Sequence, residues 1–219
     1  MKTSFCVSAA MATTAVVVAE AAVTMQQSVG MLDASNFTYS LGGPEPSTLV
    51  DGFQIRPAFL AQFPALEGYG IAMALVNMDA CTINLPHLHP RATELSYVIT
   101  GEMRTAFVEE NGGDGAVVND LSQGDIMFFP QGLIHYQQNL GCEPVTFLAA
   151  LNNEDPGAVT VQTRYFELPE EAIKASLNYE DETLQAFLEG LPMAPAEARK
   201  MCLEACGMAD PDMNEDEHD

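Results

Sequence analysis

Five short apolar or alternating runs, each bounded by glycine, proline, asparagine or aspartate, fill the middle of this 219-residue chain. They are GYGIAMALVNMD (68–79), ELSYVIT (94–100), EMRTAFVEE (102–110), DIMFFP (125–130) and PVTFLAAL (144–151). Runs of this length and composition are typical of strands in a β-sandwich or β-barrel. NGGDG at 111–115 supplies residues that accept a positive φ, as a hairpin loop requires. The pattern therefore predicts an all-β fold, with the barrel at about 50–165.

Helical signals appear only after this β-rich region. Segment 37–55 contains LGGPEPS and is expected to form an extended arm or loops. Beyond Pro169 the apolar spacing changes from two residues to about 3.6, the helical period. Three segments there begin with acidic residues or proline, or end with glycine: PEEAIKASL (169–177), DETLQAFLEGL (181–191) and PAEARKMCLEACG (195–207). A short C-terminal helical cluster is predicted at about 169–206.

The length and charge of the chain limit the classes of protein to which it can belong. A chain of this length buries one sizeable core, and 47% hydrophobic with 18% charged residues is a globular composition. Acidic residues outnumber basic ones 31 to 8, for a net charge of −23. Such a surface repels phosphate backbones and anionic lipids, so we expect no nucleic-acid and no membrane partner. The acidic tail at 210–219 is expected to be solvated and disordered, with weak collection of cations as the alternative.

The first residues have the layout of a secretory signal. One lysine precedes an uncharged apolar run from Phe5 to Ala19, and Ala19-Glu20-Ala21 follows. Residues 1–21 are therefore predicted to be a signal peptide, which leaves a mature domain at 22–209; a buried strand or helix is the alternative. The sequon at Asn36 predicts N-glycosylation in a eukaryotic source, in keeping with a secreted protein.

Removal of the signal would also remove Cys6 and leave four cysteines, which allow three disulfide pairings. Cys81 precedes the first histidine motif and Cys142 follows the second, whereas Cys202 and Cys206 lie one helical turn apart. We predict the pairs Cys81–Cys142 and Cys202–Cys206, although a bridge between positions i and i+4 is strained inside a regular helix. Free buried thiols are the alternative.

Three of the four histidines fall into two strand-turn-strand units. His87 and His89 are two residues apart, so both side chains can face one side of a strand, and Glu94 follows after a break at Pro90. In the second unit, Pro130-x-Gly132 predicts a turn that brings His135 to the start of another strand. Three imidazoles and a carboxylate, with no cysteine in either unit, predict a mixed nitrogen and oxygen metal site.

These two motifs resemble those of the cupin family, in particular the single-domain germin and spherulin-like proteins. The first is His-x-His with Glu94 and Gly101, and the second is Gly124, Pro130-x-Gly132, His135 and Asn139. The resemblance extends from about Phe37 to the end of the chain. It implies a jelly-roll barrel holding Mn(II) through His87, His89, Glu94 and His135, in a secreted, extracellular or cell-wall protein that forms trimers or hexamers.

The resemblance leaves two functions open. One is an oxidoreductase acting on superoxide or a small anionic substrate such as oxalate. The other is a non-catalytic metal-binding structural, wall, storage or encystment protein, as spherulins are usually described. Asn84 matches an asparagine near the metal in oxalate-oxidising germins, although capping a loop is its alternative role. The position of a second such asparagine in those germins is occupied here by Ala74, whose methyl group donates no hydrogen bond. Superoxide dismutation with weak or absent oxalate oxidation is therefore the expected activity.

Overall fold

The computed structural model describes residues 29–43, 48–50, 52–178, 196–198 and 200–208. The predicted signal peptide at 1–21, the helix at 181–191 and the acidic tail at 210–219 lie outside these residues. In the part of the chain that is described, no helix is long and apolar enough to cross a membrane.

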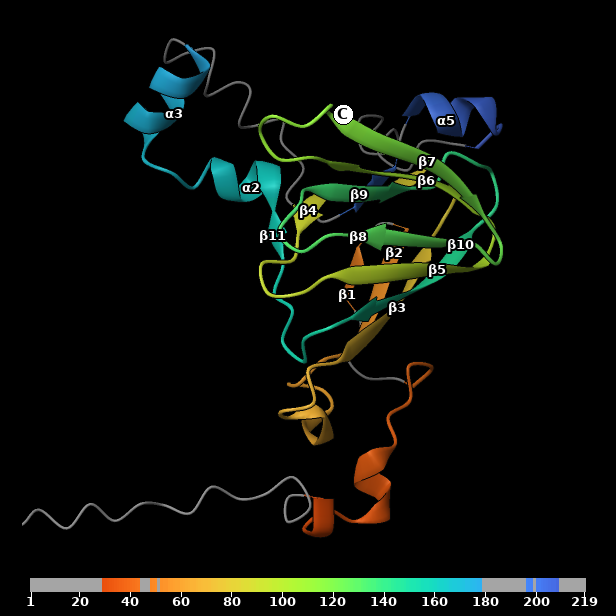
Figure 1. Ribbon diagram of the computed structural model, residues 1–219. Helices are drawn as coiled ribbons and strands as arrows, with labels where there is room; N and C mark the ends of the chain where they lie inside the picture. Colours follow the sequence, from red (N-terminus) through yellow and green to blue (C-terminus); the bar gives the residue numbers. More distant parts are fainter. Residues whose placement is uncertain (1–28, 44–47, 51, 179–195, 199, 209–219) are drawn as a thin grey trace, which may run out of the picture.

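Two antiparallel sheets face each other and enclose one core (Figure 1). In spatial order, the first sheet contains β1 (Thr48–Val50), β2 (Phe53–Ala58), β3 (Ala72–Met78), β10 (Val145–Leu151), β5 (Glu94–Thr100) and β8 (Ile126–Phe129). The second contains β11 (Val159–Thr160), β4 (Thr82–Leu88), β9 (His135–Gln138), β6 (Glu102–Val108) and β7 (Ala116–Ser122), with β12 (Ala196–Ala198) also paired to β4. The predicted all-β barrel is confirmed.

The core follows from the alternation of side chains along each strand. In β10, Val145, Phe147, Ala149 and Leu151 are buried, whereas the residues between them are only partly covered. Met103 and Leu121 of the second sheet join the same apolar cluster, so both sheets contribute to it. The NGGDG loop connects β6 to β7 as predicted, and these strands pair from Val108↔Ala116 to Glu102↔Ser122.

Gly101 is the turn at which the chain passes from the first sheet to the second. It has φ +84°, and a Cβ there would lie 2.9 Å from the carbonyl oxygen of Pro144. Only glycine satisfies both constraints, because other residues pay a steric penalty at positive φ and carry that Cβ. The turn thus places β5 and β6 on opposite sides of the core.

The helices are short and lie outside the barrel. They are η1 (Ala34–Phe37), η2 (Pro64–Leu66), α2 (Val161–Tyr165), α3 (Glu170–Leu177) and α5 (Lys200–Ala205); Figure 1 shows α2 and α3 at the left of the barrel and α5 at the upper right. Helix α3 falls in the predicted segment at 169–177. The prediction of one helix across 195–207 was wrong for its first residues, because Ala196–Ala198 pairs with Thr82–Asn84. Strand β11 pairs only with His87 and Leu88, which leaves the first residues of β4 open at this edge of the sheet. Backbone pairing with those residues outweighs the helical propensity of Ala196–Ala198.

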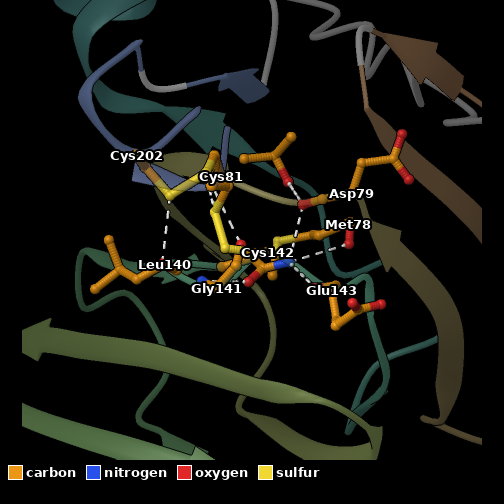
Figure 2. Close-up of a disulfide and its surroundings, with 11 residues drawn as sticks. Met78, Asp79, Cys81, Leu140, Gly141, Cys142, Glu143 and Cys202 are labelled. Carbon is orange, nitrogen blue, oxygen red and sulfur yellow. Dashed lines mark hydrogen bonds between the residues drawn. A yellow bond between two sulfur atoms is a disulfide. The ribbon is translucent and has the colours of Figure 1, made fainter. Parts of the chain in front are cut away.

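The predicted disulfide pairs were wrong. The bonds are Cys81–Cys202 (Figure 2) and Cys142–Cys206, and they connect the barrel to α5 and to the residue that follows it. The reason lies at the end of α5, where Cys206 follows the helix and its amide still bonds to the Cys202 carbonyl at 2.9 Å. Positions i and i+4 then point in the same direction, so Cys202 and Cys206 face the barrel side by side. Cys81 and Cys142 do lie in neighbouring turns, since the Cys81 amide donates to the Gly141 carbonyl at 3.2 Å, and each meets one cysteine of the helix.

One buried side chain, Asn139, holds these two turns together. Its Nδ2 lies 2.9 Å from the Asp79 carbonyl oxygen and 2.8 Å from that of Glu143, and its Oδ1 accepts a bond from the Gly141 amide at 2.9 Å. Figure 2 labels its partners Asp79, Gly141 and Glu143 beside the Cys81–Cys202 disulfide. Asn139 therefore organises the end of the barrel to which α5 is attached.

Candidate metal centre

The four predicted ligands come together between the sheets. His87 in β4 and His135 in β9 are paired in register, and His89 follows directly after β4. Glu94 begins β5 in the opposite sheet, where it pairs with Phe129 and Leu151. One potential ligand atom from each of the four residues lies within 4.8 Å of the others. The barrel therefore assembles a set of three imidazoles and one carboxylate from both of its sheets.

Each histidine ring is oriented by a hydrogen bond from Nδ1 to a backbone carbonyl. The distances are 2.8 Å from His87 to Leu85, 2.6 Å from His89 to Gly157 and 2.9 Å from His135 to Leu133. A carbonyl oxygen only accepts, so each Nδ1 carries the proton and each neutral ring keeps its lone pair on Nε2. This is the tautomer in which a histidine binds a metal through Nε2, with the other nitrogen fixed by an outer hydrogen bond.

Glu94 is the acidic centre of the cluster and is 3% exposed. Its Oε2 lies 2.9 Å from Nε2 of His89 and 3.6 Å from Nε2 of His135. Its Oε1 accepts a hydrogen bond from Ser96 Oγ at 2.6 Å. Burial favours the neutral acid, but the neighbouring His135 and His89 rings outweigh burial and hold the pKa of Glu94 well below its usual range. The site thus contains a buried carboxylate.

The histidines differ in their affinity for protons. Burial, together with the nearby His135, lowers the pKa of His87 to about 3, so this ring is neutral at physiological pH. Burial also disfavours the charged form of His89, but the hydrogen bond and charge of Glu94 outweigh it and raise the pKa of His89 above its ordinary value. Of these two rings, His89 is therefore the one that binds a proton more readily.

The arrangement fits a divalent metal ion. Nε2 of His135 is buried and has no hydrogen-bond partner among the described residues. A buried polar atom without a partner is costly, and a cation at the convergence of the Nε2 atoms and Glu94 would accept its lone pair. Three neutral nitrogens and one carboxylate oxygen form a donor set of intermediate hardness that suits Mn, Fe or Zn.

A polar network beside Glu94 was not predicted from the sequence. Gln137 is 1% exposed; its Nε2 lies 3.5 Å from Glu94 Oε1, and its Oε1 accepts a bond of 2.7 Å from Asn84 Nδ2. Asn84 therefore reaches the ligand set through Gln137. The missed signal was the period of two along a strand, because Ser96 follows Glu94 and Gln137 follows His135 on the same face.

The remaining candidate residues lie on β3, in η1 and at the disulfide end of the barrel. Ala74 belongs to β3 on the core face of the first sheet and is 1% exposed. Asn36 is exposed in η1, and its Oδ1 accepts a bond from the Asp33 amide at 2.8 Å. The four disulfide cysteines gather where Cys81 precedes β4, whereas His87 lies near the other end of that strand, about 20 Å away at the usual rise per residue.

Known proteins with similar sequences were found across most of the chain. Residues 39–185 match the family model described as Cupin. Spherulin-1A of Physarum polycephalum is 41% identical over 149 residues, which are 68% of this chain and 60% of that protein. Germin-like protein 1 of Brassica napus is 36% identical over 124 residues, 57% of this chain and 59% of that protein. The chain thus spans about three fifths of the length of these relatives.

Solved structures with the same fold include two oxalate-metabolising enzymes. A structure of oxalate oxidase superposes with a TM-score of 0.64 at 25% identity, covering 70% of this chain and 79% of that one. Oxalate decarboxylase of Bacillus subtilis, which has Mn(II) centres, superposes with a TM-score of 0.63 at 25% identity, covering 71% of this chain and 40% of that one.

Proposed function

Because this chain belongs to the cupin family, with spherulins and germin-like proteins among its relatives, we propose that His87, His89, Glu94 and His135 bind one Mn(II) ion. The observation that carries this proposal is the orphaned Nε2 of His135, buried beside a carboxylate. The Mn(II) centres of the decarboxylase with the same fold favour manganese among the metals that the donor set accepts.

The activity we propose is that of an oxidoreductase of superoxide dismutase type. When bound, manganese supplies a redox-active ion with coordination positions left over for a small anion. The residues of this chain hold the rings in the binding tautomer, and Ser96 and Gln137 contact one oxygen of Glu94. Dismutation asks little more of the protein than access for superoxide and a tuned potential, which a set of this kind provides.

Oxalate oxidation should be weak, because it requires an oriented dianion. Asn84 already donates to Gln137 and reaches the ligand set through it, and the methyl group of Ala74 has no hydrogen to donate. By analogy with the deletion of an oxyanion donor, one missing bond costs roughly 10²-fold to 10³-fold in rate. Ala74→Asn is expected to raise oxalate-dependent peroxide release, whereas brisk release by the unmodified protein would show that Ala74 is unimportant.

A non-catalytic structural or encystment role is the second candidate. It is favoured by the higher identity to the two spherulins, 41% and 44%, than to the germin-like protein at 36%. The two functions share the same ligands, so activity separates them. If the Mn-loaded protein neither consumes superoxide nor releases peroxide from oxalate, the structural role takes first place.

The test of the metal site compares two histidine variants. His135→Ala removes a ligand and should lose most of its manganese on desalting, because binding free energy depends on the complete set. His218→Ala lies in the acidic tail outside the described residues and is the matched control, expected to keep the metal. Equal manganese content in both variants, measured by plasma mass spectrometry, would refute the assignment.

Self-association is proposed through the outer face of the first sheet. Met73, Ala150, Leu95 and Phe128 form one row across neighbouring strands, and Leu75, Leu148, Tyr97 and Ile126 form the next. Among these, Ile126 is 62% exposed and Phe128 is 52% exposed. The eight residues are uncharged, and Arg56 of β2, which pairs with Leu75, is a cation at the end of the second row. Two copies of a chain with net charge −23 therefore bring no carboxylates together along these rows.

The size of this face suits a second copy of the chain. The exposed apolar side chains amount to roughly 500 Å² per copy, or about 1,000 Å² for a pair, the lower limit for a specific interface. Ile126→Glu should therefore shift the sedimentation coefficient toward a smaller assembly. Val118→Glu, at a site 54% exposed in the second sheet, is the control. Unchanged assembly of the Ile126 variant would exclude this face, while trimers or hexamers in the unmodified protein would fit the expected range.

We also propose secretion to the extracellular space or cell wall. The signal-like N-terminus and the two disulfides support it, because disulfides persist in oxidising compartments. Exposed Asn36 would then carry a glycan in a eukaryotic host. Expression in such cells should give protein in the medium whose mass falls on treatment with a glycosidase, and Asn36→Gln should abolish that fall.

A further inference from the structure

All four cysteines of the described chain gather at one end of the barrel. Cys81 lies in the turn between β3 and β4, Cys142 in the turn between β9 and β10, Cys202 in α5, and Cys206 directly after α5; Figure 2 labels the first three. The Sγ atoms of Cys81, Cys202 and Cys206 lie within 4.8 Å of one another, although they belong to two different bonds. Cys142 lies outside this group of three, but its sulfur is bonded to that of Cys206, which makes it the nearest candidate for a fourth ligand.

From this cluster we infer a second metal site: when both disulfides are reduced, the four sulfurs bind one thiolate-preferring ion, Zn(II). A zinc ion with Zn–S bonds of about 2.3 Å separates its tetrahedral ligands by about 3.8 Å. The sulfurs of Cys81 and Cys206, which are not bonded to each other, are 3.9 Å apart. One edge of the tetrahedron is therefore already in place, and reduction opens the two bonded edges.

Hydrogen bonds that involve no sulfur hold the cysteines in position. Asn139 fixes the carbonyl groups of Asp79 and Glu143, and the Cys81 amide bonds to Gly141, so Cys81 and Cys142 stay adjacent without a bridge. At the helix, three residues separate Cys202 from Cys206, which follows α5 directly. The Cys206 amide bonds to the Cys202 carbonyl at 2.9 Å. Zinc sites commonly use this spacing.

The helix also has an apolar contact of its own with the barrel. Leu203 is 5% exposed and packs in one cluster with Ala80 and Cys81, so α5 has a contact surface besides the two bonds. A metal ion at the four sulfurs would take over the attachment of α5 whenever both disulfides are reduced. This site differs in donor chemistry from the His/Glu cluster, lies about 20 Å from it along β4, and does not depend on metal binding there.

The chemistry balances with an external reductant. A water-soluble phosphine takes one oxygen from water for each disulfide, becomes the phosphine oxide, and leaves two thiols. Two equivalents therefore convert both disulfides to four thiols. Binding of Zn(II) as four thiolates then releases four protons, so the affinity rises with pH.

Cobalt(II) serves as the spectroscopic probe on the full-length protein, reduced with the phosphine and freed of it without air. One equivalent of Co(II) should produce thiolate-to-cobalt charge-transfer absorption, and Zn(II) should displace it one for one. The His/Glu cluster holds no sulfur and cannot give this band. The oxidised protein should lose it, and Cys206→Ser, with three thiolates left, should give a clearly weaker band, whereas Cys6→Ser, which leaves the cluster intact, should keep it.

Three results would overturn the inference. They are no charge-transfer band in the reduced protein, a band of equal intensity in Cys206→Ser, or loss of the band in Cys6→Ser. If reduction alone unfolds the chain, Zn(II) must restore its near-ultraviolet circular dichroism, and a failure to restore it would equally exclude the site.

Discussion

Removal of the Cys142–Cys206 bond tests how α5 stabilises the barrel. We consider the double variant Cys142→Ala/Cys206→Ala, which leaves no unpaired thiol at the site and retains Cys81–Cys202. The bond closes a loop of 64 residues, which by chain entropy alone is worth about 4.3 kcal/mol. The Cys81–Cys202 bond, with its separation of 121 residues, already offers a second route of similar length between the two sites in the unfolded chain. Two parallel routes roughly halve the effective loop and reduce the contribution to about 3.7 kcal/mol.

For a chain of this size, each kcal/mol shifts Tm by about 2–4 °C, so the double variant should melt roughly 7–15 °C lower. Thermal unfolding followed by circular dichroism measures this shift, and Met201→Ala, at a site on α5 that is 80% exposed, provides a control that touches neither bond. Manganese content should not change, because the His/Glu cluster lies near the far end of β4. A shift below about 3 °C would show that the loop-entropy argument fails here. Loss of manganese would show that the two ends of the barrel are coupled.

Three further perturbations address the centre and the fold. Ser96→Ala removes the 2.6 Å bond to Glu94 and should weaken Mn(II) binding by about 10-fold to 100-fold in calorimetric titration, whereas Ser176→Ala on α3 should leave it unchanged. Mn(II) affinity should fall as pH drops through the raised pKa of His89, because the proton and the ion compete for Nε2. His87 has a pKa of about 3 and does not contribute to this fall. A Mn(II) affinity that is independent of pH from about 8 to about 5 would contradict the prediction. Gly101→Ala should destabilise the chain by about 1–3 kcal/mol in urea unfolding because of its φ of +84° and the nearby Pro144 carbonyl, and an unchanged midpoint would refute the steric argument.

The strands and the ligand set were readable because each depends on a local period. Alternation along a strand predicted that His87 and His89 share a face, and turn residues predicted that His135 begins a strand. The register that pairs His87 with His135 depends on how distant strands meet, which no local pattern encodes. Ser96 and Gln137 follow Glu94 and His135 by two residues and share their strand faces, but serine and glutamine are not usual ligands of such metals and were not predicted.

The C-terminal region was predicted less well for a physical reason. The alanines of Ala196–Ala198 favour a helix, but the edge of β4 beyond β11 has backbone groups to pair, and tertiary context decides. The disulfide partners failed similarly. The sequence placed Cys81 near Cys142 and Cys202 near Cys206, and the missing information was how α5 docks across the barrel end.

The division of the ligands between two sheets bears on how fast an ion would exchange. His87 and His135 belong to one sheet and Glu94 to the other. An ion bound to all of them would leave only when its bonds to both sheets have broken, which ties its residence time to the rate at which the sheets separate. The dissociation rate of manganese would then report the rate at which the barrel opens, and core substitutions far from any ligand should change that dissociation rate.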